Sequence, residues 1–192
     1  GFVEMGRRLG GDKLDKYIRD FGFGQTTGSG IAGESKGILF SKEGFGPVEQ
    51  ATTAFGQGIS VTPIQQVQAV AAAINGGNLY KPYIVKEIVD SNGKSIQTFG
   101  PELKKKVISE ETSKEVRHAL ESVVANGSGR NAYTDGLRVG GKTGTAQKVV
   151  DGHYKDGEYI VSFIGFAPAD DPELLVYVAI DNPHNSVQFG GV

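Results

Sequence analysis

The chain has 192 residues, of which 38% are hydrophobic, and a formal net charge of −2 at pH 7. This length allows one domain with a substantial core, and the near-neutral charge argues against a nucleic-acid-binding function. No cysteine is present, which excludes disulfides and thiolate metal sites. The three histidines have no metal-ligand spacing, so we expect neither a metal nor a cofactor. Apolar runs are all too short to cross a membrane, and we expect any membrane anchor to lie outside this sequence.

The first part of the chain predicts two short helices and then a long loop. Residues 2–9 and 12–21 have helical patterns separated by Gly10-Gly11, with Asp12 as the expected N-cap of the second helix. Residues 22–58 are rich in glycine and have few periodic apolar side chains. We therefore expect an irregular segment there.

The clearest predicted helix follows this segment. Thr62 is its expected N-cap, Pro63 occupies the first turn, and Gln65 completes a capping box. The helix should end at Gly76-Gly77. Its predicted buried face consists of Ile64, Val67, Ala71 and Ile74.

Two further elements are predicted before residue 126. Residues 83–89 and 94–99 should form a hairpin around Asn92-Gly93. The lysines 104–106 fit a solvated loop, and a helix should run over 110–125 behind Ser109. Its expected inward side chains are Val116, Ala119, Leu120, Val123 and Val124, with His118 on the polar side.

The last third of the chain predicts an antiparallel meander. A strand containing Lys142 is followed by strands over 159–167 and 174–180, with His153 and Asp170-Asp171 in turns. The last two strands are almost continuously apolar, so we expect helices on both faces of the sheet. The fold class is thus α/β of the α+β type, with an antiparallel sheet flanked by helices.

The most informative residues are Lys142, Thr143, Gly144 and Thr145. On an exposed edge strand, lysine supplies positive charge, the threonines supply hydroxyls, and glycine permits close approach of a ligand. Free backbone groups at such an edge can pair with an extended peptide. These residues predict a site for an anionic peptide.

Residues 136–143, GLRVGGKT, also satisfy the spacing of a phosphate-binding loop. Such a loop needs a strand before it and a helix that begins at the lysine, and the flanking residues favour neither. A nucleotide-binding domain remains an alternative. A non-catalytic peptide-binding module is a second one.

Several motifs occur in the order found in class B penicillin-binding proteins, and together they span nearly the whole chain. They are FGQG at 55–58, VTPIQ at 61–65, NGG at 75–77, GGKTGTAQ at 140–147 and FIGFAP at 163–168. The chain therefore resembles these D,D-transpeptidases. Residues 37–40 and 46–54 are most similar to a sporulation-specific member.

Two motifs of this family do not occur in their expected context. The S-x-x-K pair should lie on a helix, yet the only such string, Ser91 to Lys94, falls on the predicted hairpin turn, and no S-x-N triplet exists. We therefore expect residues 1–192 to be the C-terminal portion of a transpeptidase domain, without the S-x-x-K and S-x-N segments and without the last helix. Such a portion should be inactive alone.

The resemblance implies a complete protein that cross-links peptidoglycan through a serine acyl-enzyme. Its ligands would be the D-Ala-D-Ala stem peptide and β-lactam antibiotics, and its partners divisome or spore-cortex synthesis proteins. Lys142, Thr143, Gly144 and Thr145 would bind the substrate. Lys142 and Thr145 would also be catalytic: Lys142 would share the proton network of the serine-lysine pair, and the backbone N–H of Thr145 would be an oxyanion donor. The expected location is the extracytoplasmic face of the bacterial membrane.

Overall fold

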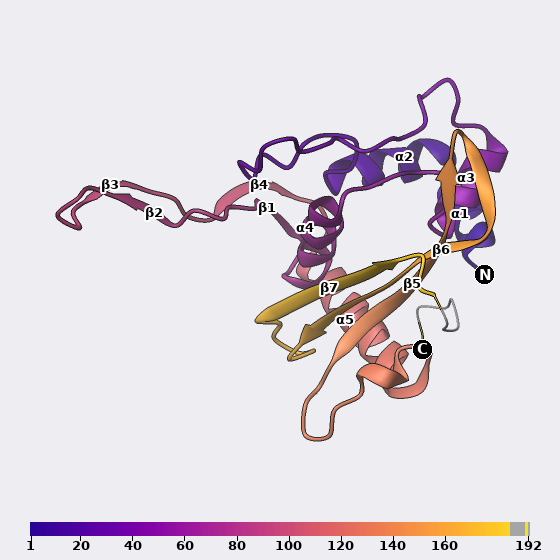
Figure 1. Ribbon diagram of the computed structural model, residues 1–192. Helices are drawn as coiled ribbons and strands as arrows, with labels where there is room; N and C mark the ends of the chain where they lie inside the picture. The colour runs from indigo at the N-terminus through magenta and orange to yellow at the C-terminus, as the bar shows by residue number, and fades with distance from the viewer. Residues whose placement is uncertain (185–190, 192) are drawn as a thin grey trace. The chain divides into compact units, whose positions relative to one another are not determined.

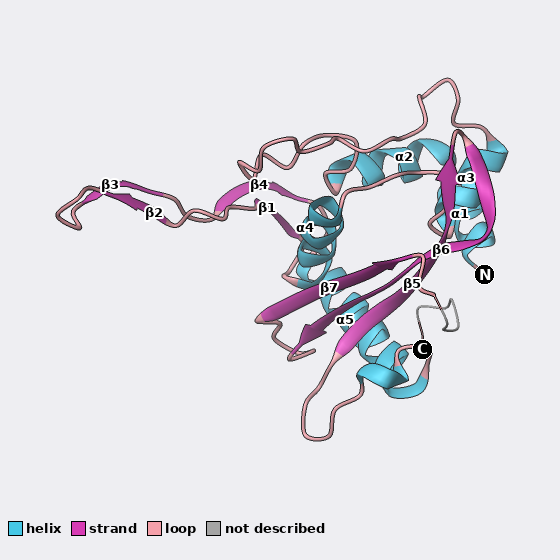
Figure 2. Ribbon diagram, viewed as in Figure 1, coloured by secondary structure: helices cyan, strands magenta, loops and turns pink. Residues whose placement is uncertain are grey.

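The computed structural model, drawn in Figure 1, describes residues 1–184 and 191. The chain divides into two compact units. Unit 1 consists of Gly1–Ala72 and Gly77–Ile108, and unit 2 of Ala73–Gly76 and Ser109–Val192. The helices and strands of both units are distinguished in Figure 2.

Unit 1 contains four helices: α1 (Phe2–Leu9), α2 (Gly11–Asp20), α3 (Pro47–Ala54) and most of α4 (Pro63–Ile74). Helix α1 is confirmed as predicted, but the N-cap of α2 is Gly10 and Asp12 lies in its first turn. Helix α3 lies inside the segment predicted to be irregular. It begins with Pro47 at its first position, and Glu49 accepts a hydrogen bond from the Gly46 N–H.

The remainder of residues 22–58 is irregular as predicted, but it is anchored by a buried side chain. Gln65 is 1% exposed. Its amide donates to the carbonyls of Gln25, at 2.8 Å, and Lys36, at 3.0 Å. Its side-chain oxygen accepts from the N–H of Thr62, which confirms the predicted capping box. One glutamine therefore starts α4 and fixes two points of the loop.

The predicted buried face of α4 is confirmed only in part, because Ile64, Val67 and Ala71 are half-buried. Ile74 is buried, but the other buried positions are Gln65, Gln68, Ala69 and Ala72. Gln68 donates to the Tyr80 carbonyl at 2.7 Å. The two glutamines are buried because their amides satisfy backbone carbonyls that would otherwise be left unpaired, which a search for apolar periodicity does not detect.

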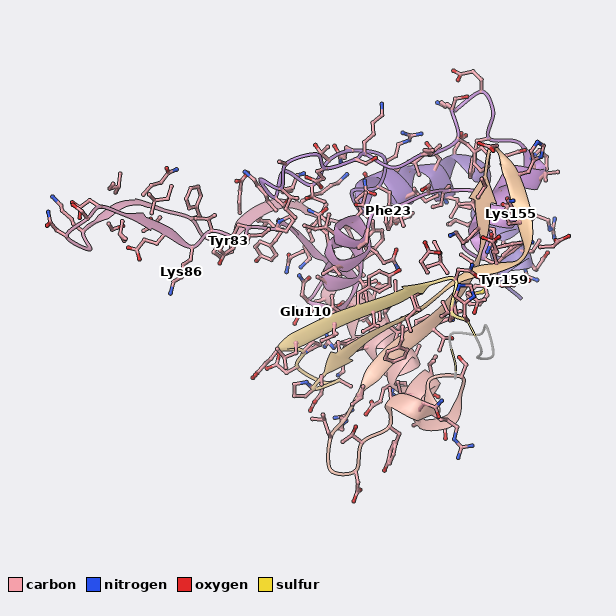
Figure 3. All side chains as sticks on the ribbon, viewed as in Figure 1. Phe23, Tyr83, Lys86, Glu110, Lys155 and Tyr159 are labelled. Atoms are coloured by element: carbon pink, nitrogen blue, oxygen red, sulfur yellow. The ribbon has the colours of Figure 1, made fainter. Side chains whose placement is uncertain are left out.

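Two small antiparallel sheets complete unit 1. Strand β1 (Asn78–Lys81) pairs with β4 (Glu102–Lys106), and β2 (Glu87–Val89) pairs with β3 (Ser95–Thr98). The β2–β3 hairpin is confirmed, and all its strand residues are exposed. Tyr83 and Lys86 lie on the arm that leads to it (Figure 3). The prediction of a loop at lysines 104–106 is wrong, because they lie in β4, where Lys105 pairs with Asp20.

Unit 2 is a three-stranded meander with a helix beside it (Figure 2). Its strands β5 (Gly140–Val150), β6 (His153–Ala167) and β7 (Leu174–Asp181) are antiparallel in the order β5-β6-β7, as predicted. Helix α5 (Glu110–Asn126) is capped by Ser109, and a short 3-10 helix, η1 (Arg130–Ala132), follows it. His118 is exposed as predicted, whereas His153 begins β6 and does not lie in a turn.

The core of unit 2 lies between α5 and one face of the sheet. Phe166, Ile74 and Ala169 are each 2% exposed, and Ala73, Leu120 and Leu175 pack against them. Ser113 of α5 donates to the Ala73 carbonyl and accepts from the Gly76 N–H. Among the expected inward residues of α5, Val124 is buried, Val116, Leu120 and Val123 are half-buried, and Ala119 is exposed.

The opposite face of β7 is exposed in the described structure. The prediction that helices cover both faces of the sheet is therefore wrong at β7. Alternate side chains on this strand are between 52% and 68% exposed: Leu174, Val176, Val178 and Ile180. No helix among the described residues is long and apolar enough to cross a membrane.

Candidate active site

The Lys142–Thr145 stretch lies on β5, the edge strand of the unit 2 sheet. Its register against β6 pairs Lys142 with Ile164, Thr143 with Phe163, Gly144 with Ser162 and Thr145 with Val161. These are the residues predicted as the site, and the structure places all four along a single extended backbone at the sheet margin. The predicted edge-strand position is therefore confirmed.

Glycines allow β5 to pack tightly against β6. A Cβ atom at Gly140 would lie 2.3 Å from the Phe166 ring, and one at Gly141 would lie 2.4 Å from the Phe163 ring. At Gly144 the added atom would lie 2.5 Å from the Ser162 Oγ. A side chain at Gly140 or Gly141 would clash with these rings and, at Gly141, with the Ile164 carbonyl at 2.8 Å, whereas the Ser162 hydroxyl opposite Gly144 can rotate away. Gly140 and Gly141 therefore allow β5 to lie close to β6.

Lys142 is exposed and its ammonium group lies over the edge of its own strand. Its Nζ donates to the Thr143 carbonyl at 2.7 Å and lies 3.5 Å from the Thr143 Oγ1. A Thr143 carbonyl that accepted a hydrogen bond from β6 would leave little room for the Lys142 ammonium. We therefore infer that this carbonyl points away from β6. Alternate residues of a strand direct their backbone groups to the same edge, so the backbone N–H of Thr145 shares that direction.

The two lysines of β5 differ in electrostatic environment. Lys148 forms an ion pair with Asp181 at 2.7 Å, and this carboxylate raises the pKa of the Lys148 amine. Within residues 1–184 and 191, Lys142 has no carboxylate within ion-pair distance. Its positive charge is therefore available to an anionic ligand at the strand edge.

The side chains of Thr143 and Thr145 lie on the same face of β5, because alternate residues of a strand point to one side. Thr143 lines a hollow of about 190 Å³ beside this strand. The other residues that line it are Phe163 of β6, Gly191, and four residues that follow α5: Ser128, Gly129, Asn131 and Ala132. The Ser128 Oγ lies 3.0 Å from the Thr143 Oγ1.

Ser128 and Asn131 were not among the predicted site residues. Asn131 donates from its Nδ2 to the Gly191 carbonyl at 2.9 Å, and both residues line the hollow. The only local signal was the glycine pair that flanks Ser128, and it indicates a turn without indicating which strand the turn contacts. Their place at the site depends on the packing of α5.

The nucleotide-binding alternative is wrong. Residues 140–143 lie inside an eleven-residue strand, and no helix begins at Lys142. A phosphate-binding loop depends on the free N–H groups and the dipole of a helix N-terminus, which are absent from this segment. Ser91 and Lys94 lie on the β2–β3 turn, where the Asp90 carboxylate accepts from the N–H groups of Asn92 and Lys94, so this S-x-x-K string is not on a helix.

The far end of the β5–β6 hairpin is also held by side chains. Gln147 donates from its Nε2 to the Lys155 carbonyl at 3.0 Å and to the Asp156 carboxylate at 3.2 Å. Figure 3 shows Lys155 and Tyr159 on this part of β6. These hydrogen bonds join β5 to β6 beyond Thr145.

Comparison with known proteins identifies the family. Residues 1–191 match the family model described as the penicillin binding protein transpeptidase domain. The chain belongs to the transpeptidase domain family of the penicillin-binding proteins. Its resemblance to class B members, predicted from the motifs, is confirmed.

Individual members of this family are similar over the whole chain. Stage V sporulation protein D of Bacillus subtilis is 68% identical over 192 residues, which are 100% of this chain and 30% of that protein. The probable peptidoglycan D,D-transpeptidase PenA of Neisseria meningitidis is 35% identical over 193 residues, again 100% of this chain and 31% of that protein. The similarity to a sporulation-specific member is thereby confirmed. The chain spans about a third of the length of these relatives.

Solved structures of the family have the same fold. Penicillin binding protein 3 of Mycobacterium tuberculosis, solved with ampicillin, superimposes with a TM-score of 0.88 at 33% identity, over 94% of this chain and 42% of that one. The transpeptidase domain of Burkholderia pseudomallei penicillin-binding protein 3 gives a TM-score of 0.85 at 33% identity, over 100% of this chain and 55% of that one. The predicted class, helices with an antiparallel sheet, is confirmed.

Proposed function

We propose that this chain is the substrate-binding part of a peptidoglycan D,D-transpeptidase, and that it forms the C-terminal portion of that enzyme's catalytic domain. The observation that carries the proposal is Lys142: an exposed cation without a carboxylate partner in the described structure, on an edge strand of a chain that matches the family over residues 1–191. The complete protein would provide the nucleophilic serine and its lysine from residues outside this sequence.

The reaction is an acyl transfer in two steps. The serine oxygen attacks the carbonyl of the penultimate D-alanine of a stem peptide, and the peptide bond breaks with release of the terminal D-alanine. An amine of a neighbouring strand then attacks the resulting ester, which frees the serine and forms the cross-link. A β-lactam would acylate the same serine.

Each residue of the site strand has a role in this scheme. The ammonium of Lys142 attracts the terminal carboxylate of the substrate, and the hydroxyls of Thr143 and Thr145 donate hydrogen bonds to it. Gly144 allows the peptide to approach the strand closely. The backbone N–H of Thr145 stabilises the developing oxyanion together with a donor near the serine.

The setting of the reaction follows from the same family membership. We place the complete enzyme on the extracytoplasmic face of the cell membrane, where peptidoglycan is assembled, with an anchor outside this sequence. Its similarity to a sporulation protein favours a role in spore cell-wall synthesis, with other spore-cortex proteins as partners.

Acylation of the complete protein by a fluorescent penicillin tests the proposal. Removing a charge-assisted hydrogen bond costs about 1.5–3 kcal/mol, so Lys142→Ala should lower the second-order rate constant for acylation by about tenfold or more. Thr145→Ala removes a neutral hydroxyl and should lower it less, by about three- to tenfold. Melting temperatures should stay unchanged, because both side chains lie on the edge strand.

Lys148→Ala is the matched control, since Lys148 lies on the same strand but is paired with Asp181. It should leave the acylation rate constant unchanged. Equal acylation rate constants for Lys142→Ala, Thr145→Ala and the unmodified protein would show that this strand does not belong to the site. A complete protein that binds stem peptide but never acylates would instead be a non-catalytic peptide-binding module. The isolated chain should not be labelled at all, and stoichiometric labelling of it would contradict the proposed position of the serine.

A further inference from the structure

We propose that Ser128 is a positioning residue that orients the hydroxyl of Thr143 toward the carboxylate of the substrate. This inference rests on the proposed function. It concerns a residue on the loop after α5, which forms no part of the site strand itself. Its Oγ lies 3.0 Å from the Thr143 Oγ1, and both residues line the hollow beside β5.

The direction of the hydrogen bond follows from the number of protons. Each hydroxyl has one proton to donate and can accept from other donors. If Thr143 is to donate its proton to a carboxylate, it cannot also donate to Ser128. Ser128 must then donate to Thr143, which gives the ordered series Ser128 to Thr143 to carboxylate. Hydrogen bonds in such a series polarise one another, so the contact strengthens the donor that faces the ligand.

Ser128 is held firmly enough for this task. The N–H groups of Gly127 and Gly129, on either side of it, both donate to the Val123 carbonyl at 3.0 Å. Val124, one residue further along α5, is 1% exposed. The position of Ser128 is therefore set by the C-terminal turn of a packed helix.

Thr143 needs an external contact of this kind. Its β-branched side chain has few χ1 rotamers, but they direct the hydroxyl to different places, and among the described residues no further strand pairs with the outer edge of β5 to select one. The Lys142 Nζ, 3.5 Å from the Thr143 Oγ1, is at the limit of hydrogen-bond distance. The Ser128 contact is the shorter of the two and selects the rotamer.

The test uses the complete enzyme and compares benzylpenicillin with its methyl ester, by competition with a fluorescent penicillin. Ser128→Ala should lower the acylation rate constant for the acid about three- to tenfold, the size expected for one hydrogen bond. It should change the rate constant for the ester much less, because the ester lacks the charged group that Thr143 contacts. The preference for acid over ester should therefore fall.

Two further variants separate positioning from folding. Ser128→Thr keeps a hydroxyl at this place and should restore most of the preference for the acid. Asn126→Ala alters an exposed side chain in the same turn, which donates a long hydrogen bond to the Ser122 Oγ at 3.5 Å, and should have no effect. A purely structural role of Ser128 would lower the acid and ester rate constants by the same factor.

An unchanged acid-to-ester ratio in Ser128→Ala overturns this inference while leaving the proposed function intact, provided that the unmodified enzyme is acylated. Failure of the unmodified enzyme to react with any penicillin overturns both. Acylation of the unmodified enzyme, measured first, therefore distinguishes the two failures.

Discussion

The two units are stabilised in different ways. Unit 1 has short helices and a long loop, and a few buried amides, above all Gln65, connect that loop to a helix. Unit 2 has a continuous strand ladder backed by an apolar cluster around Phe166. The candidate site lies on the unit whose backbone geometry is set by regular pairing. Regular strand pairing therefore sets the position of a sheet edge, whereas an irregular surface needs individual polar contacts.

Loss of the apolar cluster should be the most damaging change. Phe166→Ala removes a ring that is 2% exposed and packs with Ile74 and Ala169. We expect the free energy of unfolding to fall by about 3–5 kcal/mol, as for other buried aromatic truncations. Urea unfolding followed by circular dichroism measures it. Val176→Ala, on the exposed face of β7, should cost less than about 0.5 kcal/mol, and equal losses for the two variants would show that the cluster is not the core.

Loss of the polar anchor in unit 1 should have the next largest effect. Gln65→Ala leaves the carbonyls of Gln25 and Lys36 and the N–H of Thr62 without their partner, so we expect a loss of about 2–4 kcal/mol. Gln65→Glu keeps the acceptor for Thr62 but places a carboxylate beside two carbonyls, and it should be equally harmful. Gln66→Ala is the neighbouring control. Hydrogen exchange should show faster exchange across residues 25–36 in both Gln65 variants, and unchanged exchange there would contradict the anchor.

The smallest effect should come from an exposed ion pair of unit 2. Arg138 contacts Glu121 at 2.7 Å, and this guanidinium lowers the pKa of the Glu121 carboxyl below its ordinary value of 4.5. A lowered pKa means that the unfolded chain takes up the proton more readily, so the pair's stabilising contribution is complete above the unfolded value and is lost as the pH falls below it.

Melting temperatures of Glu121→Gln and the unmodified protein should therefore differ slightly at pH 7 and converge at a pH below the folded-state pKa of Glu121. Glu115→Gln, on the exposed side of the same helix, is the control and should match the unmodified protein at both values. If the difference in melting temperature between Glu121→Gln and the unmodified protein stayed constant with pH, the charge of Glu121 would not contribute to stability.

The elements that were predicted correctly have signals within a few residues. Thr62 with Gln65, Ser109 before α5, and Asn92-Gly93 in the hairpin each specify a cap or a turn locally. The site strand was found for the same reason, since its glycines and Lys142 are consecutive in the sequence. Family motifs then extended the prediction to the whole chain.

The missed features depend on contacts between distant residues. Helix α3 lies in a glycine-rich segment and is stabilised by packing on α1, where Gly6 allows the close approach of Ala54. The lysines of β4 look like a solvated loop until β1 pairs with them. Ser128 is unremarkable in the sequence, and only the packing of α5 brings it to Thr143. No local pattern encodes such a pairing.

The exposed β2–β3 hairpin has a practical use. Every residue of its two strands is accessible, and its tip is a short turn at Asn92-Gly93. Exposed tips of this kind tolerate insertions well. A fluorophore or a small tag introduced at this turn would label the protein and leave the residues of the β5–β6 ladder unchanged.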